Sequence, residues 1–398
     1  MIELFVNGLS ASAGGGLTYL RNLIPQLAAR ADVKATILLP RTLCVEFSDQ
    51  ANLRFMEGPG RGTAVRRLAW EQLRLPELIR RQRAEALISC GNVALWNSPV
   101  PQILLSRNSL YTSSEFYRDL RNRREYGMWL ENRVKAAIAR RSIDRADITI
   151  APSAAFAGEL QKWSGREVAA IPHGFDRAVF WDDRRFLSAD VQSKIDQAAG
   201  CLRLLFVSHY NYYRSFETLL HALALLQERL ARPVKLFLTC TLTRSRTPGN
   251  YDPASAAKLV STLKIAGAVT ELGAIPYRSL HQLYRACDIY VTPAYAESFA
   301  HPLVEAMSAG LPVVASDLAV HREICGQAAL YFDQGSSQQL AKQVAFVAES
   351  QALAGELSQR GRKRSLDFSW EKHAAELVRA AAMLTGKDSH IQLSRVAS

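Results

Sequence analysis

The sequence predicts an α/β protein built from two Rossmann-like, doubly wound parallel sheets. Two sets of short apolar segments alternate with stretches of helical spacing, and a turn-like segment at 173–176 separates the sets. Alternation of strands and helices along a chain favours parallel sheets, whose ligands bind beyond the carboxyl ends of the strands. The 398 residues also suit two domains of roughly 150–200 residues each.

The first set opens with a strand at 2–6, a turn containing Gly14, Gly15 and Gly16, and an amphipathic helix at 17–30. Apolar segments predict further strands at 33–39, 86–89, 101–105, 148–151 and 168–172. Two arginine-rich stretches, 61–83 and 118–145, have helical spacing. We expect this domain to comprise 1–173.

The second set begins with a strand at 201–207, and a domain at 174–369 is predicted from it. Further strands are expected at 234–238, 269–272, 289–292 and 312–316, with helices at 216–230, 255–263 and 302–309. A last helix at 370–384 and a polar tail make up 370–398.

Two glutamates separated by seven residues mark the most informative segment. Glu297 falls in a loop after a predicted strand, and Glu305 lies on the first turns of a helix that Gly310 ends. Backbone N–H groups at a helix N-terminus attract anions. Carboxylates beside such an anion site suit the hydroxyl groups that flank the diphosphate of a nucleotide sugar. Either glutamate alone is more simply a surface acid, but the pair favours a ligand site.

This segment resembles the donor-binding motif of glycosyltransferase family 4, also described as glycosyl transferases group 1. The resemblance is strongest over 200–375 and weaker over 1–173. It implies a retaining enzyme of the GT-B fold, with two Rossmann-like domains facing across a cleft and a C-terminal crossover helix that returns to the first domain. It also implies that Glu297 contacts the donor sugar and that Glu305 binds the ribose hydroxyls.

The resemblance assigns donor binding to the loop between the two glutamates and the start of the helix. These residues are Ser298, Phe299, Ala300, His301, Pro302 and Leu303. Ser298 and Ala300 stand where the family usually has glycine. Their small side chains allow close approach of the backbone to a diphosphate, but a positive φ angle at either position is expected to be strained.

A second part of the donor site is expected after the strand at 201–207. The family typically has a Gly-Arg pair and then Lys-Gly here, and His209 and Arg214 stand at the two cationic positions. Arg214 is a permanent cation that binds phosphate bidentately, so it is expected to stabilise the leaving diphosphate. His209 donates one hydrogen bond unless a phosphate keeps it protonated. Glu297, Arg214 and His209 are the catalytic candidates. The alternative for this segment, an ordinary surface loop rich in tyrosine, is disfavoured by its position directly after a strand.

Candidates for the acceptor or sugar side come from the first domain. In the family, a glycine loop like that of Gly15 and Gly16 lies near the transferred sugar, but a flexible turn explains it equally well. Arg107 and Asn108 follow a strand where many relatives carry a His-Asp pair, so the usual histidine has no match. His173 resembles the histidine of a His-Gly pair near the hinge, and a structural role is the simpler alternative.

A further stretch near the same cleft is interpreted mainly as turn and helix-cap chemistry. It contains Ser316 and Asp317, followed by His321 and Glu323.

The charge of the chain bears on its partners. Its net charge is +12, and 1–173 hold 24 Lys and Arg against 16 Asp and Glu, an excess of 8. A solvated arginine face explains the helical periodicity, and the excess predicts weak binding to an anionic membrane surface. Nucleic acid is not expected as a partner because no reading motif accompanies the charge.

Other features limit the class of protein. Six scattered cysteines without a Cys-x-x-Cys pair indicate a reduced, cytoplasmic protein. Apolar segments fall short of the ~20 residues of a membrane span, and the N-terminus lacks signal-peptide character, so any membrane association is expected to be peripheral, on the inner face. Histidines lack metal-ligand spacing, and neither a metal nor a cofactor is expected.

These features predict a retaining, metal-independent glycosyltransferase. It would move a hexose from a nucleotide diphosphate sugar to a hydroxyl of a glycan or lipid-linked acceptor, in polysaccharide, O-antigen or glycolipid assembly. Mannose from GDP-mannose is modestly favoured over sugars of UDP donors, and no motif fixes the base, acceptor or linkage. The alternatives are a nucleotide-sugar epimerase of the same fold and a non-catalytic basic binding protein.

Overall fold

The computed structural model describes residues 1–10, 15–59, 63–242, 249 and 251–387. The chain divides into two compact units. The first contains Met1–Thr112, Glu125–Gly174 and the chain from Ser369 onward, and the second contains Ser113–Arg124 and Phe175–Phe368. The chain passes from one unit to the other after Gly174 and after Phe368, each one residue from a predicted domain limit, at 173 and 369. The segment Ser113–Arg124, which the sequence prediction places in the first domain, groups with the second unit.

The first unit contains a seven-stranded parallel sheet in the order β3-β2-β1-β4-β5-β6-β7. Its strands are β1 (Ile2–Asn7), β2 (Val33–Leu39), β3 (Leu53–Glu57), β4 (Ala86–Ser89), β5 (Gln102–Leu105), β6 (Ile148–Ala151) and β7 (Ala169–Ala170). Its helices are α1 (Gly15–Ala28), α2 (Arg41–Cys44), α3 (Ala64–Arg81), the 3-10 turn η1 (Ser109–Tyr111), α5 (Tyr126–Arg145), α6 (Ala154–Ser164) and α16 (Trp370–Leu384).

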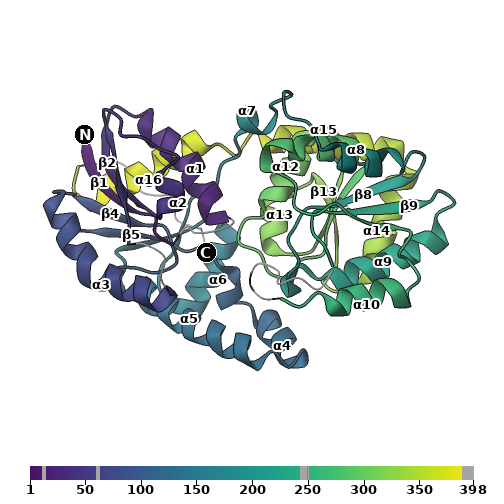
Figure 1. Cartoon of the computed structure of the whole chain (residues 1–398), viewed down its shortest axis with the longest axis horizontal. Helices are drawn as coiled ribbons and strands as arrows, with labels where there is room; N and C mark the ends of the chain where they lie inside the picture. The colour runs from purple at the N-terminus through teal and green to yellow at the C-terminus, as the bar shows by residue number, and fades with distance from the viewer. Residues whose placement is uncertain (11–14, 60–62, 243–248, 250, 388–398) are drawn as a thin grey trace. The chain divides into compact units, whose positions relative to one another are not determined.

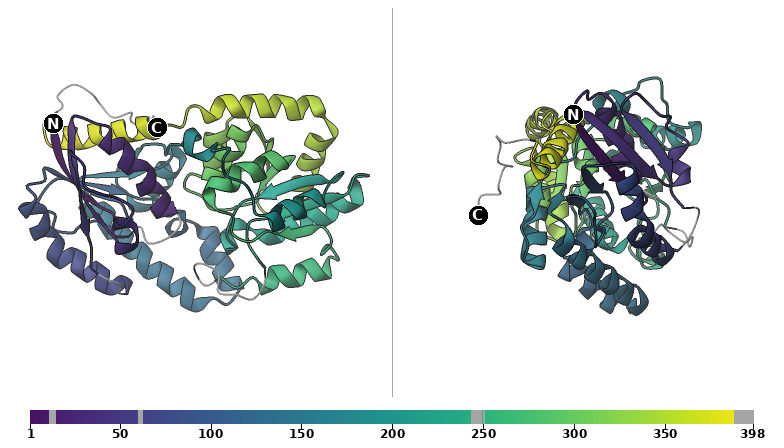
Figure 2. Two further views of the ribbon diagram at one scale, coloured as in Figure 1. Left: turned by 45° about the horizontal axis from the view of Figure 1, so that its top comes forward. Right: turned by 90° about the vertical axis from the view of Figure 1, so that its left-hand side faces the viewer.

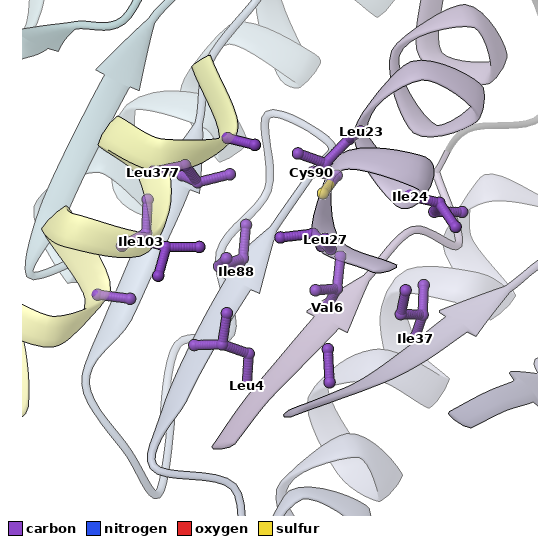
Figure 3. Packing of buried hydrophobic residues seen from close by; sticks show 14 of the residues in the cluster. Leu4, Val6, Leu23, Ile24, Leu27, Ile37, Ile88, Cys90, Ile103 and Leu377 are labelled. Atoms are coloured by element: carbon purple, nitrogen blue, oxygen red, sulfur yellow. The ribbon is translucent and has the colours of Figure 1, made fainter. Parts of the chain in front are cut away.

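Both faces of this sheet are buried. Leu4 and Val6 of β1 pack with α1 and with Leu377 of α16 in one apolar cluster (Figure 3). Phe5 points to the opposite face, into a second cluster that includes Leu75 of α3. A strand covered on both faces is apolar at nearly every position, which explains why Glu3 is the one charged residue in 2–6.

Helix α16 joins the first unit although it lies almost 200 residues after the rest of that unit's sequence. It packs along α1, as Figure 2 shows from a second direction. The sequence predicts that Gly15 and Gly16 lie in a turn before the helix. Helix α1 instead begins at Gly15, so both glycines belong to its first turn. Gly14 lies outside the described residues.

The second unit contains a six-stranded parallel sheet in the order β10-β9-β8-β11-β12-β13. Its strands are β8 (Leu202–Phe206), β9 (Val234–Leu238), β10 (Val269–Glu271), β11 (Ile289–Thr292), β12 (Val313–Ser316) and β13 (Ala329–Phe332). Its helices are α4 (Ser114–Asn122), α7 (Arg177–Phe180), α8 (Ala189–Asp196), η2 (Tyr212–Arg214), α9 (Phe216–Arg229), α10 (Ala254–Thr262), η3 (Tyr277–Ser279), α11 (Leu280–Ala286), α12 (His301–Ala309), α13 (Ala319–Cys325), α14 (Ser337–Glu349) and α15 (Gln351–Ser365).

Helices cover both faces of this second sheet as well. Helix α9 contacts α10 and α14, and α12 contacts α11, α13 and α15; Figure 1 shows the two groups on opposite sides of the strands. The strand order reverses direction between β8 and β11, which are hydrogen-bonded neighbours. In open α/β sheets, ligands bind beyond the carboxyl ends of the strands at such a switch point.

The arginine-rich stretch 118–145 is not one helical region. Helix α4 ends at Asn122 and α5 begins at Tyr126, and Arg124 between them adopts a left-handed conformation with φ of 61°. A left-handed residue cannot continue a right-handed helix, so the chain changes direction there. As a result, α4 groups with the second unit and α5 with the first.

Candidate active site

The centre of the candidate site is an ion pair at the switch point of the second sheet. Arg214 ends η2, in the segment that follows β8, and Glu297 lies in the loop that follows β11. Because β8 and β11 are neighbours, their following segments meet, and the backbone N–H of Tyr295 donates to the carbonyl of Tyr213 over 3.0 Å. The Arg214 guanidinium donates to the Glu297 carboxylate.

Burial makes this pair strongly coupled. Both side chains are mostly buried, at 18% and 11% exposure. Burial disfavours the charge on Glu297, but the charge and hydrogen bond of Arg214, together with His321 and the Ser298 N–H, hold the pKa of Glu297 below its usual value. Burial likewise opposes the charge on Arg214, and Glu297 reverses that effect and raises the pKa of Arg214. The site therefore holds a fixed cation beside a fixed carboxylate.

Glu305 lies eight residues further on, in the second turn of α12. Its carboxylate is buried and accepts a hydrogen bond of 2.8 Å from the hydroxyl of Tyr284 on α11. Burial raises the pKa of Glu305 to about 7, and the Tyr284 hydroxyl partly opposes that shift. A carboxylate that titrates near neutral pH at the start of a helix is an unusual feature for a purely structural residue.

The loop between the glutamates is compact and anchored by apolar contacts. Phe299 and Leu303 are buried, and the Phe299 ring packs edge-on against Phe368. The Ser298 N–H donates to the Glu297 carboxylate over 3.2 Å, so this amide orients the glutamate. Ala300 precedes α12 with φ of 65°, the kind of positive angle for which the sequence predicts strain. His301 begins the helix, and its imidazole packs on Phe299. Pro302 occupies the helix's first turn, where its missing N–H carries no cost.

Several buried polar atoms at this site lack a partner within the part of the chain that the structure describes. Six such side-chain atoms occur, and three belong here: Asn211 Oδ1, Arg214 Nε and His321 Nε2. Buried polar groups are almost always hydrogen-bonded in folded proteins. Their concentration beyond the carboxyl ends of β8 and β12 indicates that a polar ligand completes the site.

A network from α4 supports the two loops and was missed in the sequence. Tyr295 donates to Asp119 of α4 over 2.8 Å, and Asp119 also pairs with Arg123. Arg123 pairs in turn with Glu217 of α9, and its guanidinium lies 4.2 Å from the centre of the Tyr212 ring. Apart from the pair of Asp119 and Arg123 within α4, each contact joins residues more than 80 positions apart, so no local pattern in the sequence indicates it.

His209 is exposed, in the segment that carries Arg214, and its catalytic role stays a prediction. The expectation for Ser316 and Asp317 changes. Ser316 and Asp317 do not cap α13, whose N-cap residue is Leu318 without a side-chain cap. Asp317 instead pairs with Arg322, and the Ser316 hydroxyl donates to the Ala294 carbonyl.

The candidates in the first unit gather around Tyr19 of α1. Arg107 lies with its guanidinium 4.5 Å from the centre of the Tyr19 ring, and it donates to the Cys90 carbonyl. His173 is buried, with ring centres 5.1 Å from Tyr19 and 5.5 Å from Trp370. These contacts give Arg107 and His173 structural partners within their own unit.

Asn108 has a local structural role, and Gly15 lies at an open position. The Asn108 side chain accepts a hydrogen bond of 3.1 Å from the Leu110 N–H and so caps η1. Gly15 is exposed, and a Cβ atom placed on it would meet no atom within 4 Å. Space alone does not require a glycine there.

Among the described residues, no three or more His, Cys, Asp or Glu side chains are grouped to hold a metal ion. A search of the same residues for membrane-spanning helices finds no helix with the needed length and apolarity.

Comparison with protein families gives two adjacent matches. The family described as Glycosyltransferase Family 4 matches residues 13–179, and the family described as Glycosyl transferases group 1 matches residues 193–364. Together these matches span most of both units, including Arg214, Glu297 and Glu305.

Characterised relatives are distant. The O-antigen chain mannosyltransferase B of Escherichia coli is 30% identical over 118 residues, which are 30% of this chain and 31% of that protein. The D-inositol 3-phosphate glycosyltransferase of Pseudarthrobacter chlorophenolicus is 28% identical over 334 residues, 77% of this chain and 75% of that protein. The match thus spans about a third of the mannosyltransferase and three quarters of the second relative.

Solved structures share the fold over nearly the whole chain. Sucrose-phosphate synthase from Thermosynechococcus elongatus superposes with a TM-score of 0.75 at 19% identity, covering 98% of this chain and all of that one. Anabaena HepE in complex with UDP gives a TM-score of 0.70 at 19% identity, over 96% of this chain and all of HepE. WaaG, a glycosyltransferase involved in lipopolysaccharide biosynthesis, gives 0.66 at 16% identity, over 97% and 100%.

The two parallel sheets, the paired loops at the second switch point and these matches agree. The chain belongs to glycosyltransferase family 4 and has the GT-B fold.

Proposed function

We propose that this protein is a retaining, metal-independent glycosyltransferase that moves a sugar from a nucleotide diphosphate donor to an acceptor hydroxyl. The observation that carries the proposal is the buried pair of Arg214 and Glu297 at the switch point, beside the N-terminus of α12 and the buried Glu305. A cation, a helix N-terminus and two carboxylates match the charges and hydroxyl groups of a nucleotide sugar.

Each charged group has a distinct part in this reaction. The Glu305 carboxylate accepts hydrogen bonds from the ribose hydroxyls, and the Arg214 guanidinium binds the diphosphate. The bond between the anomeric carbon and the diphosphate oxygen breaks, and its electron pair leaves with the diphosphate. The acceptor oxygen forms the new bond to that carbon, and its proton passes to the departing diphosphate oxygen. Arg214 stabilises the negative charge that develops on the leaving group.

Glu297 is proposed to bind the transferred sugar near the reacting carbon. In the described structure its carboxylate pairs with Arg214. A diphosphate competes with Glu297 for the guanidinium, and a carboxylate released from part of that pairing accepts sugar hydroxyls. Donor binding and preparation of the sugar site are then coupled through one ion pair.

The donor is proposed to be a nucleotide diphosphate hexose, and mannose is the first sugar to test. Support for mannose comes from the similarity to the E. coli O-antigen mannosyltransferase. Support for a uridine donor comes from HepE, which was solved with UDP and with UDP-glucose. The acceptor is proposed to be a glycan or lipid-linked hydroxyl in polysaccharide, O-antigen or glycolipid assembly.

We also propose that the protein is cytoplasmic and that its first unit binds to the inner face of an anionic membrane. On α3, Val65 and Leu73 are 75% and 77% exposed, and arginines flank them. On α5, Leu130 and Val134 are also exposed, beside Arg133. Exposed apolar side chains between arginines are typical of helices that lie on anionic lipid.

A product assay with donor alone and with added acceptor tests the proposed reaction. Transfer to the acceptor without a metal, in the presence of EDTA, is expected from the wild-type chain. Glu297→Ala should abolish transfer while its circular dichroism spectrum stays unchanged. An altered sugar formed from donor alone contradicts transfer and favours an epimerase. Salt-dependent lipid binding without any donor binding contradicts catalysis altogether.

A further inference from the structure

His321 is a buried histidine that the proposed reaction has not yet used. It lies on α13, five residues after β12 ends at Ser316, and its side chain is fully buried. Its Nδ1 atom is 2.9 Å from the Ser316 carbonyl oxygen and 3.2 Å from the Ser316 hydroxyl. Strand β12 is the neighbour of β11, so His321 reaches the switch point from a third strand.

The Ser316 carbonyl determines which nitrogen of the imidazole carries the proton. A carbonyl oxygen only accepts hydrogen bonds, so Nδ1 must donate and therefore holds the proton. Burial lowers the pKa of His321 to about 4, so the ring is neutral at physiological pH. The lone pair of Nε2 is then free to accept, and Nε2 is buried without a partner among the described residues.

His321 belongs to the same site as the ion pair. It lies close enough to Glu297 and Arg214 to interact electrostatically with both. The Ser316 hydroxyl, which holds the imidazole, also donates to the Ala294 carbonyl at the start of the Glu297 loop. The backbone that orients His321 is thus tied to the backbone that carries Glu297.

We propose that Nε2 of His321 accepts a hydrogen bond from a hydroxyl of the transferred sugar, and that His321 thereby selects the donor sugar. The inference rests on the proposed function, because it requires a nucleotide-sugar donor at this site. A lone pair requires a partner that carries a hydrogen. The diphosphate of a nucleotide sugar carries none at neutral pH, whereas every sugar hydroxyl does. A buried acceptor also penalises a sugar that presents no hydroxyl there, because Nε2 then stays unpaired.

The substitution His321→Asn separates the two nitrogens. The asparagine amide retains a donor for the Ser316 carbonyl but places no atom at Nε2. His321→Gln is the matched variant, because its longer side chain brings an acceptor oxygen to the Nε2 position. Binding is measured by calorimetry with two probe pairs, UDP with UDP-glucose and GDP with GDP-mannose.

His321→Asn is expected to weaken binding of the sugar nucleotide roughly tenfold, the cost of one lost buried hydrogen bond. Affinity for the nucleoside diphosphate should change less than about twofold, and His321→Gln should recover part of the loss. Deoxyfluoro analogues each lack one hydroxyl of the sugar. The analogue that lacks the hydroxyl bound by Nε2 should have the same affinity for wild type and for His321→Asn, and so identifies that hydroxyl.

Three results would overturn the inference. Equal losses for the diphosphate and its sugar in His321→Asn show a structural role only. A structural role also follows if His321→Asn lowers the affinity for every deoxyfluoro analogue by the same factor. Unchanged sugar-nucleotide binding in a folded His321→Asn variant excludes the contact. If wild type binds neither member of either pair, the proposed function itself fails, which is a different result from these three.

Discussion

Ala300 adopts a left-handed backbone conformation at the point where α12 begins. Its φ is 65° and its side chain is buried. Left-handed geometry costs about 1–2 kcal/mol for a residue with a Cβ atom. The cost is tolerated because the chain must turn sharply between Glu297 and the helix, and strain of this kind is common at functional sites.

The substitution Ala300→Gly should be nearly neutral, within about 0.5 kcal/mol, because relief of strain offsets the lost methyl group and the greater freedom of the unfolded chain. Ala306→Gly, in the middle of α12 and equally buried, should cost about 2 kcal/mol from helix propensity and methyl burial. Urea unfolding of both variants measures the contrast. An equal loss in both would show that the left-handed geometry carries no strain.

Glu305 titrates in a range that experiments reach easily. Its pKa is raised from 4.5 to about 7 in the folded protein, so the native state holds the proton more tightly than the unfolded state. The resulting stability is fully present below about pH 4.5 and is lost as pH rises through about 7. Glu305→Gln should flatten this part of the pH–stability profile, measured by thermal unfolding at closely spaced pH values. An unchanged profile would mean that Glu305 does not titrate near neutral pH.

The loops of the site are positioned by elements that lie far apart in sequence. Tyr295, two residues before Glu297, is held by Asp119 on α4, and Arg123 ties the same helix to α9. Helix α4 thus braces both the Glu297 loop and the segment that carries Arg214.

Removal of the Tyr295 hydroxyl tests this support. Tyr295→Phe should lower the free energy of unfolding by about 1 kcal/mol, because Asp119 loses a buried donor. It should also reduce kcat for sugar transfer, since the Glu297 loop loses a fixed contact. Tyr126→Phe, at an exposed position on α5, is the control and should change neither quantity. A stable, fully active Tyr295→Phe variant would remove the positioning role.

Most elements could be predicted from local patterns, and the exceptions have physical causes. The strands that became β8, β11 and β12 are short apolar segments bounded by turn residues, so their positions follow from composition. Strand β3 is only partly buried and mixes charged with apolar residues, so its pattern is weak. The break between α4 and α5 was hidden because helical spacing continues through Arg124, whose backbone geometry leaves no mark on hydrophobic periodicity.

The site was predictable where its residues form a motif and not where they meet through the fold. The spacing of Glu297 and Glu305 and the resemblance of their segment and that of Arg214 to a family predict these three residues. The local sequence around His321 indicates only turn and cap chemistry, because the role proposed for His321 depends on the pairing of β11 with β12. The α4 network requires a helix from one part of the chain to join the unit formed by another, which single-sequence reasoning does not foresee.

At the scale of the whole molecule, the arginine excess of the first unit predicts binding to anionic membranes. Vesicles that contain phosphatidylglycerol should bind the protein at low salt and release it as ionic strength rises, because arginine attraction is screened. Val65→Ser with Leu73→Ser should weaken sedimentation with vesicles without altering donor binding. Neutral phosphatidylcholine vesicles are the control. Equal binding to neutral vesicles, or none at low salt, would contradict the proposal.

The central claim is that the second unit holds a nucleotide-sugar site built on Arg214, Glu297 and Glu305. A thermal-shift screen of nucleoside diphosphates and their sugars tests it most directly. A ligand at ~100 times its dissociation constant should stabilise the wild type by about 2.7 kcal/mol. Arg214→Met, which removes the cation, should lose the response to diphosphates. Failure of every nucleotide diphosphate and nucleotide sugar to raise the unfolding temperature of the wild type would contradict the account.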